Sequence, residues 1–255
     1  MKNWSGTWAL FRRECRRFLK VWVQTLGAPL VSALLYFAIF GGALGQRIGI
    51  IDGISFLVFL VPGLTAMGML QHSYQNSSSS LIQMKYLGLI PADLLALPLT
   101  ALQVTLAFMG ASMVRGVAVG GLTLLVSRLF VPFGIAHPVL LVVSACLIAA
   151  IFGLLGVLMG ILARTYDDIS VVGHFLLTPL VYLGGVFFSI TMLPEGWRLL
   201  VLANPVFYLV DLFRYALLGV SQGWPLWSLW ISVLFLCVFF ILTVQVLHRG
   251  WRIKN

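Results

Sequence analysis

The chain has 255 residues, of which 61% are hydrophobic and 9% are charged. An ordinary soluble domain carries about 25% charged residues, so this composition excludes a soluble globular protein and indicates that lipid is the solvent. A helix needs about 20 apolar residues to cross a bilayer, and this length accommodates six spans with short connections. We expect an all-α membrane protein with six transmembrane helices in a single transmembrane domain, residues 1–255.

The net charge of +9 comes from 16 lysines and arginines against seven acidic residues. A chain this apolar leaves no soluble basic face that tracks a phosphate backbone, so nucleic acid is not an expected partner. The three cysteines are far apart in the sequence and form no C-x-x-C motif. We therefore expect neither a disulfide framework nor a metal site.

Residues 4–22 are predicted to form an interfacial amphipathic helix. Apolar residues recur there at steps of three and four, and five basic residues between positions 12 and 20 occupy the remaining face. A helix that is basic on one side and rich in tryptophan on the other is typical of the headgroup layer. The apolar stripe consists of Trp4, Trp8, Phe11, Cys15, Phe18 and Trp22.

The first two spans are expected at about 22–44 and 55–76. A polar tract, residues 75–80, follows the second span and reads Gln-Asn-Ser-Ser-Ser-Ser. Residues 83–97 come next, and Pro91 and Asp93 interrupt this segment. It is therefore predicted to be an amphipathic segment at the membrane surface and not a span.

The third span has two possible registers. Arg115 and Arg128 bracket residues 116–127, which is roughly 18 Å of helix against a hydrocarbon core of about 30 Å. Outward snorkelling of both arginines closes that gap. A span that begins near Leu102 would instead place Arg115 in mid-membrane, at a cost of about 2.5–3.5 kcal/mol. We favour the first register, with residues 102–114 as an interfacial lead-in.

Three further spans are expected at about 138–162, 169–190 and 225–247. The fourth is rich in glycine, which lets helices approach closely. Residues 191–223, between the last two spans, are too apolar for a solvated loop and too interrupted by charges and prolines for a clean span. Re-entrant helices suit this segment best.

Lysine and arginine are unevenly distributed over the connections of this layout. With both termini in the cytoplasm, the cytoplasmic segments hold eleven basic residues and the outer segments hold four, with Arg115 set apart. This asymmetry favours cytoplasmic termini. The sequence shows no internal repeat, so an inverted-repeat secondary transporter gains no support.

Motifs of enzymes are scarce in this sequence. Asp167 and Asp168 are a possible cation site of a membrane transferase, but a third carboxylate at helical spacing is missing, and a turn with a helix cap is the simpler interpretation. The sequence contains no G-x-x-x-x-G-K-[ST], so the chain does not bind ATP through a P-loop. The predicted spans lack acidic residues, which argues against ion coupling within the chain. The energy for transport is therefore expected from outside the chain.

The order of several short motifs resembles the permease subunit of ABC-2 type exporters, which include drug, lipo-oligosaccharide and polysaccharide exporters. The resemblance covers nearly the whole chain. Its weaker parts are the basic N-terminal helix, PGL at 62–64 and RG at 115–116. Its more specific parts are TPLVYLGGVFFSITMLP at 178–194 and NPVFYLVDLFRYALLG at 204–219. Relatives often carry a pair of acidic residues before Leu-Leu in the coupling segment, whereas this chain has Asp93 alone.

The resemblance implies a transport subunit that is not itself an enzyme. Two permease copies, expected to be identical, would associate with two ATP-binding subunits in the bacterial inner membrane. ATP and Mg²⁺ would bind to those partners, and this chain would bind no cofactor. The residues implied in coupling to the ATPase are Arg12, Arg13, Arg16, Arg17, Lys85 and Asp93.

The substrate implied by the resemblance is an amphipathic, lipid-linked or glycan-type molecule that leaves the cytoplasm. The residues predicted along its path are Tyr74, Gln75, Asn76, Phe187, Phe188 and Tyr208. Asp211 and Arg214 lie three residues apart in the re-entrant segment and are predicted to form a structural ion pair. An ion-coupled secondary transporter and an integral-membrane transferase remain the alternative functions.

Overall fold

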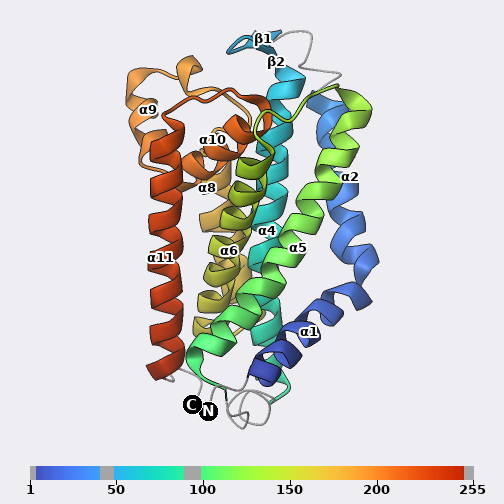
Figure 1. Ribbon diagram of the computed structural model, residues 1–255, viewed down its shortest axis with the longest axis vertical. Coiled ribbons are helices and arrows are strands. Elements are labelled where there is room, and N and C mark those ends of the chain that lie inside the picture. The colour runs from blue at the N-terminus through green and yellow to red at the C-terminus, as the bar shows by residue number, and fades with distance from the viewer. Residues whose placement is uncertain (1–3, 41–48, 89–98, 250–255) are drawn as a thin grey trace.

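The computed structural model describes residues 4–40, 49–88 and 99–249. It is an elongated bundle of helices that run between two ends (Figure 1). We call the end that holds helix α1, Trp4–Lys20, the terminal end. The opposite end carries a two-stranded antiparallel hairpin of β1, Ile50–Ile51, and β2, Ile54–Ser55, and we call it the hairpin end.

Four helices of the bundle are long and apolar enough to cross a membrane. The fourth and sixth predicted spans are confirmed at nearly the expected bounds. The four helices are α4, Phe56–Tyr86; α5, Ala101–Phe130; α6, Pro138–Leu162; and α11, Pro225–Arg249.

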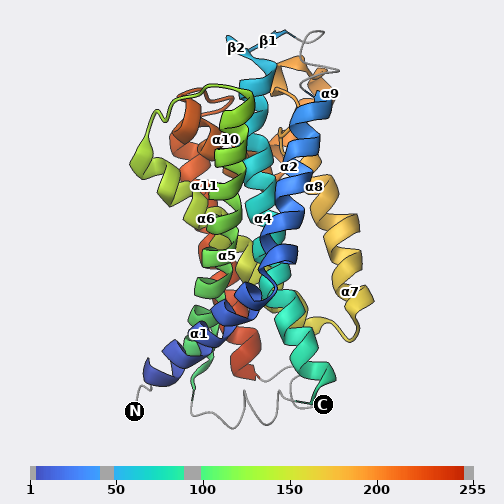
Figure 2. The ribbon, with the colours of Figure 1, turned by 90° about the vertical axis from the view of Figure 1, so that its right-hand side faces the viewer.

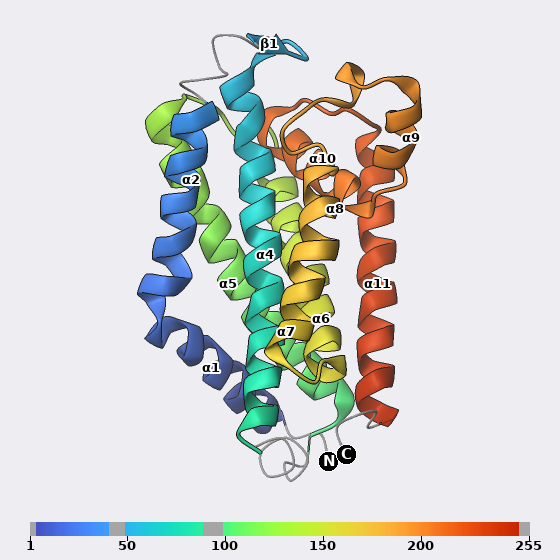
Figure 3. The same ribbon diagram turned by 180° about the vertical axis from the view of Figure 1, so that it is seen from behind.

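Two shorter helical segments, each of 17 residues, correspond to the first and fifth predicted spans. The first comprises a π-helical stretch, Val23–Gly27, and α2, Ala28–Ile39, and it turns by 75° relative to α1. The second comprises α7, Tyr166–Val171, a π-helical stretch, Val172–Leu177, and α8, Thr178–Tyr182. Both segments extend from the terminal end towards the hairpin end (Figures 2 and 3). The fifth crossing ends earlier than the predicted residue 190.

Helix α4 lies at the centre of the bundle, and small residues bring α6 close to it. A Cβ atom at Gly156 would collide with the backbone carbonyl of Tyr74, and one at Gly160 would lie 2.8 Å from Cβ of Leu81. Such contacts require glycine, because any side chain would push the two helices apart. The predicted role of the glycines in the fourth span is therefore confirmed.

The polar tract that we expected after the second span lies inside α4. Ser77 and Ser78 are fully buried, and Ser77 Oγ lies 2.6 Å from Oγ of Ser112 on α5. Ser78 Oγ donates to the carbonyl of Tyr74 on the preceding turn of its own helix. Serines that satisfy their hydroxyls in this way pack like small residues, so the helix of the second span continues without a break to Tyr86.

The favoured register of the third span is wrong. Helix α5 runs without interruption from Ala101 to Phe130, so Arg115 lies near the middle of a membrane-spanning helix. The Thr100 side chain caps its N-terminus and accepts from the backbone N–H of Gln103 at 3.3 Å. This capping box starts the helix well before Arg115. The residues that we expected as an interfacial lead-in, 102–114, therefore belong to the span.

The segment between the fifth and sixth crossings stays at the hairpin end. It contains a short 3₁₀ turn, Ile190–Met192, then α9, Glu195–Leu202, and α10, Pro205–Leu218. The axes of α9 and α10 meet at 86°. Because α8 finishes and α11 begins towards the same end, the segment enters and leaves there, as a re-entrant pair does (Figures 1 and 3).

Candidate functional site

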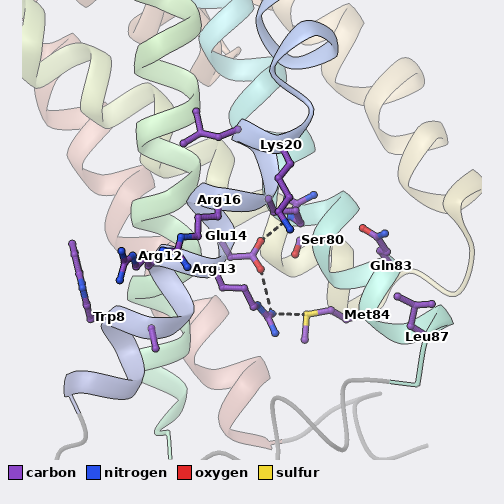
Figure 4. A pocket seen from close by; sticks show the side chains of 13 residues that line it. Trp8, Arg12, Arg13, Glu14, Arg16, Lys20, Ser80, Gln83, Met84 and Leu87 are labelled. Atoms are coloured by element: carbon purple, nitrogen blue, oxygen red, sulfur yellow. Dashed lines mark hydrogen bonds and ion pairs between the residues drawn. The ribbon is translucent and has the colours of Figure 1, made fainter.

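A basic groove lies between α1 and the last turns of α4 at the terminal end (Figure 4). Its volume is about 1100 Å³. Five basic side chains of α1 line one wall, and polar and apolar residues of α4 line the other. The basic residues are Arg12, Arg13, Arg16, Arg17 and Lys20, and the opposite wall includes Ser80, Gln83, Met84 and Leu87.

Glu14 organises this groove, and the sequence analysis missed it. Its side chain is 1% exposed and accepts from Arg13 Nη2 at 3.2 Å and from Arg17 Nε at 3.1 Å. Glu14 belongs to the face of α1 that is buried against the bundle, together with Leu10 and Phe18. The sequence does show this feature: Glu14 is the single acidic residue of an arginine-rich helix, and it lies four residues from both Leu10 and Phe18 on the buried face.

The two arginines bound to Glu14 also reach helix α4. Arg17 Nη2 donates to the backbone carbonyl of Asn76 at 2.6 Å, and Arg13 Nη2 contacts the sulfur of Met84 at 3.1 Å. These contacts attach α1 to the last turns of α4. Arg12 and Arg16, in contrast, are exposed at the mouth of the groove.

Lys85 lies close to the groove but points towards α6. Its Nζ donates to the backbone carbonyls of Ile161 and Ala163, at the C-terminal end of α6. The next residue, Tyr86, stacks on Tyr166 of α7 with ring centroids 5.2 Å apart. The end of α4 is therefore joined to the turn that precedes the fifth crossing. Asp93, the other coupling candidate, lies outside the described residues.

Asp168 is a helix cap, as the simpler interpretation predicted. It lies in the first turn of α7, at the terminal end of the bundle, where Thr165 is the N-cap. Its carboxylate accepts from the backbone N–H of Arg164 at 2.7 Å and of Thr165 at 3.1 Å. These backbone hydrogen bonds lower the pKa of Asp168 below its ordinary value. The residues that the structure describes contain no cluster of three or more side chains suited to a metal.

The predicted substrate-path residues do not meet in one cavity. The hydroxyl of Tyr74 donates to the carbonyl of Ile169 at 3.1 Å, and Asn76 Nδ2 donates to Ser112 Oγ at 3.2 Å, so both are part of the buried core. Gln75, between them, is exposed. These two buried side chains hold neighbouring helices together.

The aromatic candidates lie at the hairpin end. Phe187 stacks on Phe40 with centroids 5.2 Å apart and meets Tyr182 edge-on at 5.5 Å. Phe188, the next residue in the sequence, is half-buried. Tyr208 is separate, and its hydroxyl donates to the carbonyl of Leu202 at 2.7 Å. The first group is an aromatic cluster between the first and fifth crossings, whereas Tyr208 joins α10 to α9.

The predicted ion pair between Asp211 and Arg214 is wrong. Asp211 accepts from the backbone N–H of Gln222 at 2.7 Å and from the hydroxyl of Ser228 at 2.9 Å. Arg214 donates to the carbonyl of Gly185 at 2.6 Å and lies over the ring of Phe59, 4.0 Å from its centroid. Both side chains are fully buried, and each binds its own set of partners.

Comparisons with known proteins place this chain in one family. The profile of the family "ABC-2 type transporter" matches residues 5–218. The chain is 38% identical over 252 residues to the inner membrane transport permease YadH of Escherichia coli K12, covering 99% of this chain and 98% of that protein. It is 24% identical over 263 residues to nodulation protein J of Rhizobium leguminosarum bv. viciae, covering 97% and 94%. The chain therefore belongs to the ABC-2 type transporter family, as a multi-pass inner-membrane permease without enzymatic activity of its own.

Proposed function

We propose that this permease exports an amphipathic, lipid-linked or glycan-type substrate from the cytoplasm, driven by ATP that a separate subunit hydrolyses. The observation that carries the proposal is the basic groove at the terminal end. Its exposed cations, Arg12 and Arg16, have no carboxylate partner among the described residues and are available to an acidic surface of another protein. ATP and Mg²⁺ bind to that partner.

The terminal end is cytoplasmic in this proposal. The five basic side chains of the groove and Arg249 at the end of α11 lie there, whereas the turn between the β-strands carries Asp52. An excess of lysine and arginine marks the cytoplasmic side of a membrane protein. Both termini are then cytoplasmic, and the re-entrant pair lies at the outer side.

The contacts around the groove provide a route for mechanical coupling. Glu14, Arg13 and Arg17 attach α1 to α4, and α1 continues through the 75° bend into the first crossing. Lys85 and Tyr86 attach the end of α4 to α6 and α7. A displacement of α1 or of the end of α4 by a closing ATPase therefore reaches the first, second and fifth crossings together.

A second copy of the permease completes the transport path in this proposal. The cavity between α2 and α4 has a volume of about 120 Å³. Pockets that hold a drug-sized ligand measure about 300–1,000 Å³, so this cavity is too small for a lipid or a glycan. The larger path is expected between two copies, which we propose are identical.

Isolation of the permease from native membranes tests the proposal. We expect an ATP-binding subunit to copurify and the complex to hydrolyse ATP, while the permease alone hydrolyses none. ATP hydrolysis by the permease alone, or the absence of an ATP-binding subunit from every preparation, contradicts it. Transport driven by an ion gradient without ATP would support a secondary carrier, and turnover lost in Asp167→Asn with assembly intact would support a transferase.

A further inference from the structure

A pair of nitrogen-rich side chains lies within the membrane-spanning part of the bundle. Arg115 of α5 donates from Nη2 to Nδ1 of His72 on α4, at 3.4 Å. A guanidinium has five donors and no acceptor, so Nδ1 of the imidazole accepts this bond. The ring proton is then on Nε2, and the pair presents further donors but no acceptor.

The positive charge of Arg115 is not neutralised by the described part of the chain. No carboxylate among residues 4–40, 49–88 and 99–249 forms an ion pair with it, and its buried Nε has no hydrogen-bond partner. The charged side chain that acts electrostatically on Arg115 is Arg17, which is also positive. An arginine in mid-span costs about 2.5–3.5 kcal/mol, and a bound anion would offset that cost.

A small cavity with mainly apolar walls is lined by His72, whereas Arg115 contacts this imidazole but does not itself line the cavity. Its volume is about 120 Å³, and α2, α4 and α5 enclose it. Five of its lining side chains can form hydrogen bonds: Ser32, Tyr36, Gln71, His72 and Thr123. A water molecule occupies about 30 Å³ in the liquid, so the space holds about four waters or one phosphate or carboxylate group. It does not hold a sugar chain or a whole lipid.

We propose that His72 and Arg115 bind the anionic group, a phosphate or carboxylate, of an amphipathic molecule whose apolar part stays in the bilayer beside α2. Helices α2 and α4 lie side by side along one face of the bundle (Figure 3), and Val31 and Leu35 of α2 are exposed on the surface of the bundle. The planar fork of an arginine matches a phosphate or carboxylate. A membrane phospholipid and a transported substrate share this chemistry. The assignment of the anion to a transported substrate rests on the proposed function.

Direct binding tests the site without transport. The permease, with its native companions, is placed in nanodiscs of phosphatidylcholine and titrated with hexadecyl phosphate or with uncharged hexadecanol. We expect saturable binding of the phosphate and none of the alcohol. Arg115→Gln should weaken phosphate binding by about tenfold or more, because hydrogen bonds to a charged group contribute about 1.5–3 kcal/mol. Arg115→Lys should retain part of the affinity.

Arg128→Gln is the matched control. Arg128 is on the same helix and carries the same charge, but it is exposed and lies over the ring of Phe133, 5.4 Å from its centroid. Its loss should leave hexadecyl phosphate binding unchanged. Equal binding by wild type and Arg115→Gln, or equal binding of hexadecanol, overturns the proposal. A loss of fold in Arg115→Gln also overturns it, because removal of a charge that has no carboxylate partner among the described residues should not unfold the chain.

Measurement of ATP hydrolysis distinguishes the two sources of the anion, a transported substrate and a membrane phospholipid. Stimulation of hydrolysis by hexadecyl phosphate identifies the site as part of substrate recognition. Competition by phosphatidylglycerol without any change in hydrolysis identifies a resident lipid. Both results support the anion site. Because binding is measured without ATP, the proposed function can fail, through absence of the ATP-binding subunit, while the anion site still stands.

Discussion

The two ends of the bundle hold their charges in different ways. At the terminal end, Glu14 is one buried carboxylate among five basic side chains of the groove, and Arg12 and Arg16 remain exposed. At the hairpin end, Asp52 and Asp211 accept hydrogen bonds from neutral hydroxyl, amide and backbone groups. Cations are thus available for a partner at one end, whereas Asp52 and Asp211 at the other end are bound within the chain.

This difference suggests different mechanical roles for the two ends. Asp52 accepts from Ser189 at 2.7 Å and from Gln222 at 3.1 Å, so the hairpin turn is tied to the segments after α8 and before α11. Charge-assisted bonds that converge on Asp52 and on the buried Asp211 favour one arrangement of these segments. In the groove, Arg13 and Arg17 share the buried carboxylate of Glu14, and the open volume is about 1100 Å³. We infer that the hairpin end is rigid and that the terminal end adapts to its partner.

The largest effect is expected when the hairpin network is broken with Asp211→Ala. Asp211 is fully buried and accepts from Ser221, Ser228 and the backbone of Gln222. Its removal leaves these donors unpaired and should lower the free energy of unfolding by about 3 kcal/mol. Denaturant unfolding followed by tryptophan fluorescence measures the change. Glu195→Ala removes a charge of the same sign at an exposed position of the same end and should have little effect. Equal losses of unfolding free energy in the two variants would contradict a stabilising role for the buried contacts of Asp211.

A smaller effect on stability is expected from Glu14→Gln at the terminal end. The substitution removes the charge that holds Arg13 and Arg17, whose side chains are 39% and 28% exposed. Because solvent screens partly exposed arginines, the free energy of unfolding should fall by about 1 kcal/mol. The coupled function should suffer more, because Glu14 would no longer hold Arg13 and Arg17 in position for their contacts with α4.

ATP hydrolysis by the complex measures that uncoupling. Glu14→Gln should still bind the ATP-binding subunit but should lose stimulation of hydrolysis by substrate. Gln83→Glu alters the charge of the opposite wall without touching the Glu14 contacts and serves as a comparison. Normal stimulation in Glu14→Gln would show that the link between α1 and α4 does not transmit motion.

The double substitution Arg12→Ser with Arg16→Ser should change stability by less than about 0.5 kcal/mol, because both side chains are exposed. It should instead weaken the association with the ATP-binding subunit, and raised salt should weaken the wild-type association in the same direction. Affinity at low and high salt, measured by surface plasmon resonance, checks both statements. An unchanged affinity would remove the groove as the docking surface.

The sequence predicted best the elements whose patterns are local. The spans at 138–162 and 225–247 are continuous apolar runs with a proline at their first helical position, and their bounds need no tertiary information. The re-entrant character of residues 191–223 was predicted from their prolines and charges, and the break between α9 and α10 falls at Asn204-Pro205, where Asn204 accepts from the backbone N–H of Val206. Local chemistry fixes each of these features.

Features that depend on a partner helix were mispredicted. Ser77 and Ser112 are 35 positions apart, so the sequence alone gave no reason to bury a serine tract. The same holds for Arg115, whose position was judged by its insertion cost without knowledge of His72 and the adjacent cavity. The spacing of Asp211 and Arg214 suggested a pair, but backbone carbonyl and hydroxyl groups from distant segments bind them instead.

The smallest effect is expected at the Asp168 cap of the terminal end. Its backbone hydrogen bonds lower the pKa of Asp168, so the folded state holds the proton less tightly than the unfolded state. The cap therefore stabilises the protein above the unfolded pKa, near about 4, and this contribution is lost as the pH falls through the folded value. The thermal midpoint of Asp168→Ala should be lower than that of wild type at pH 7, and the difference should shrink as the pH falls through the lowered pKa of Asp168. Asp167→Ala removes a neighbouring charge that makes no capping contact, and a similar convergence there would mean that net charge, and not the cap, causes the effect.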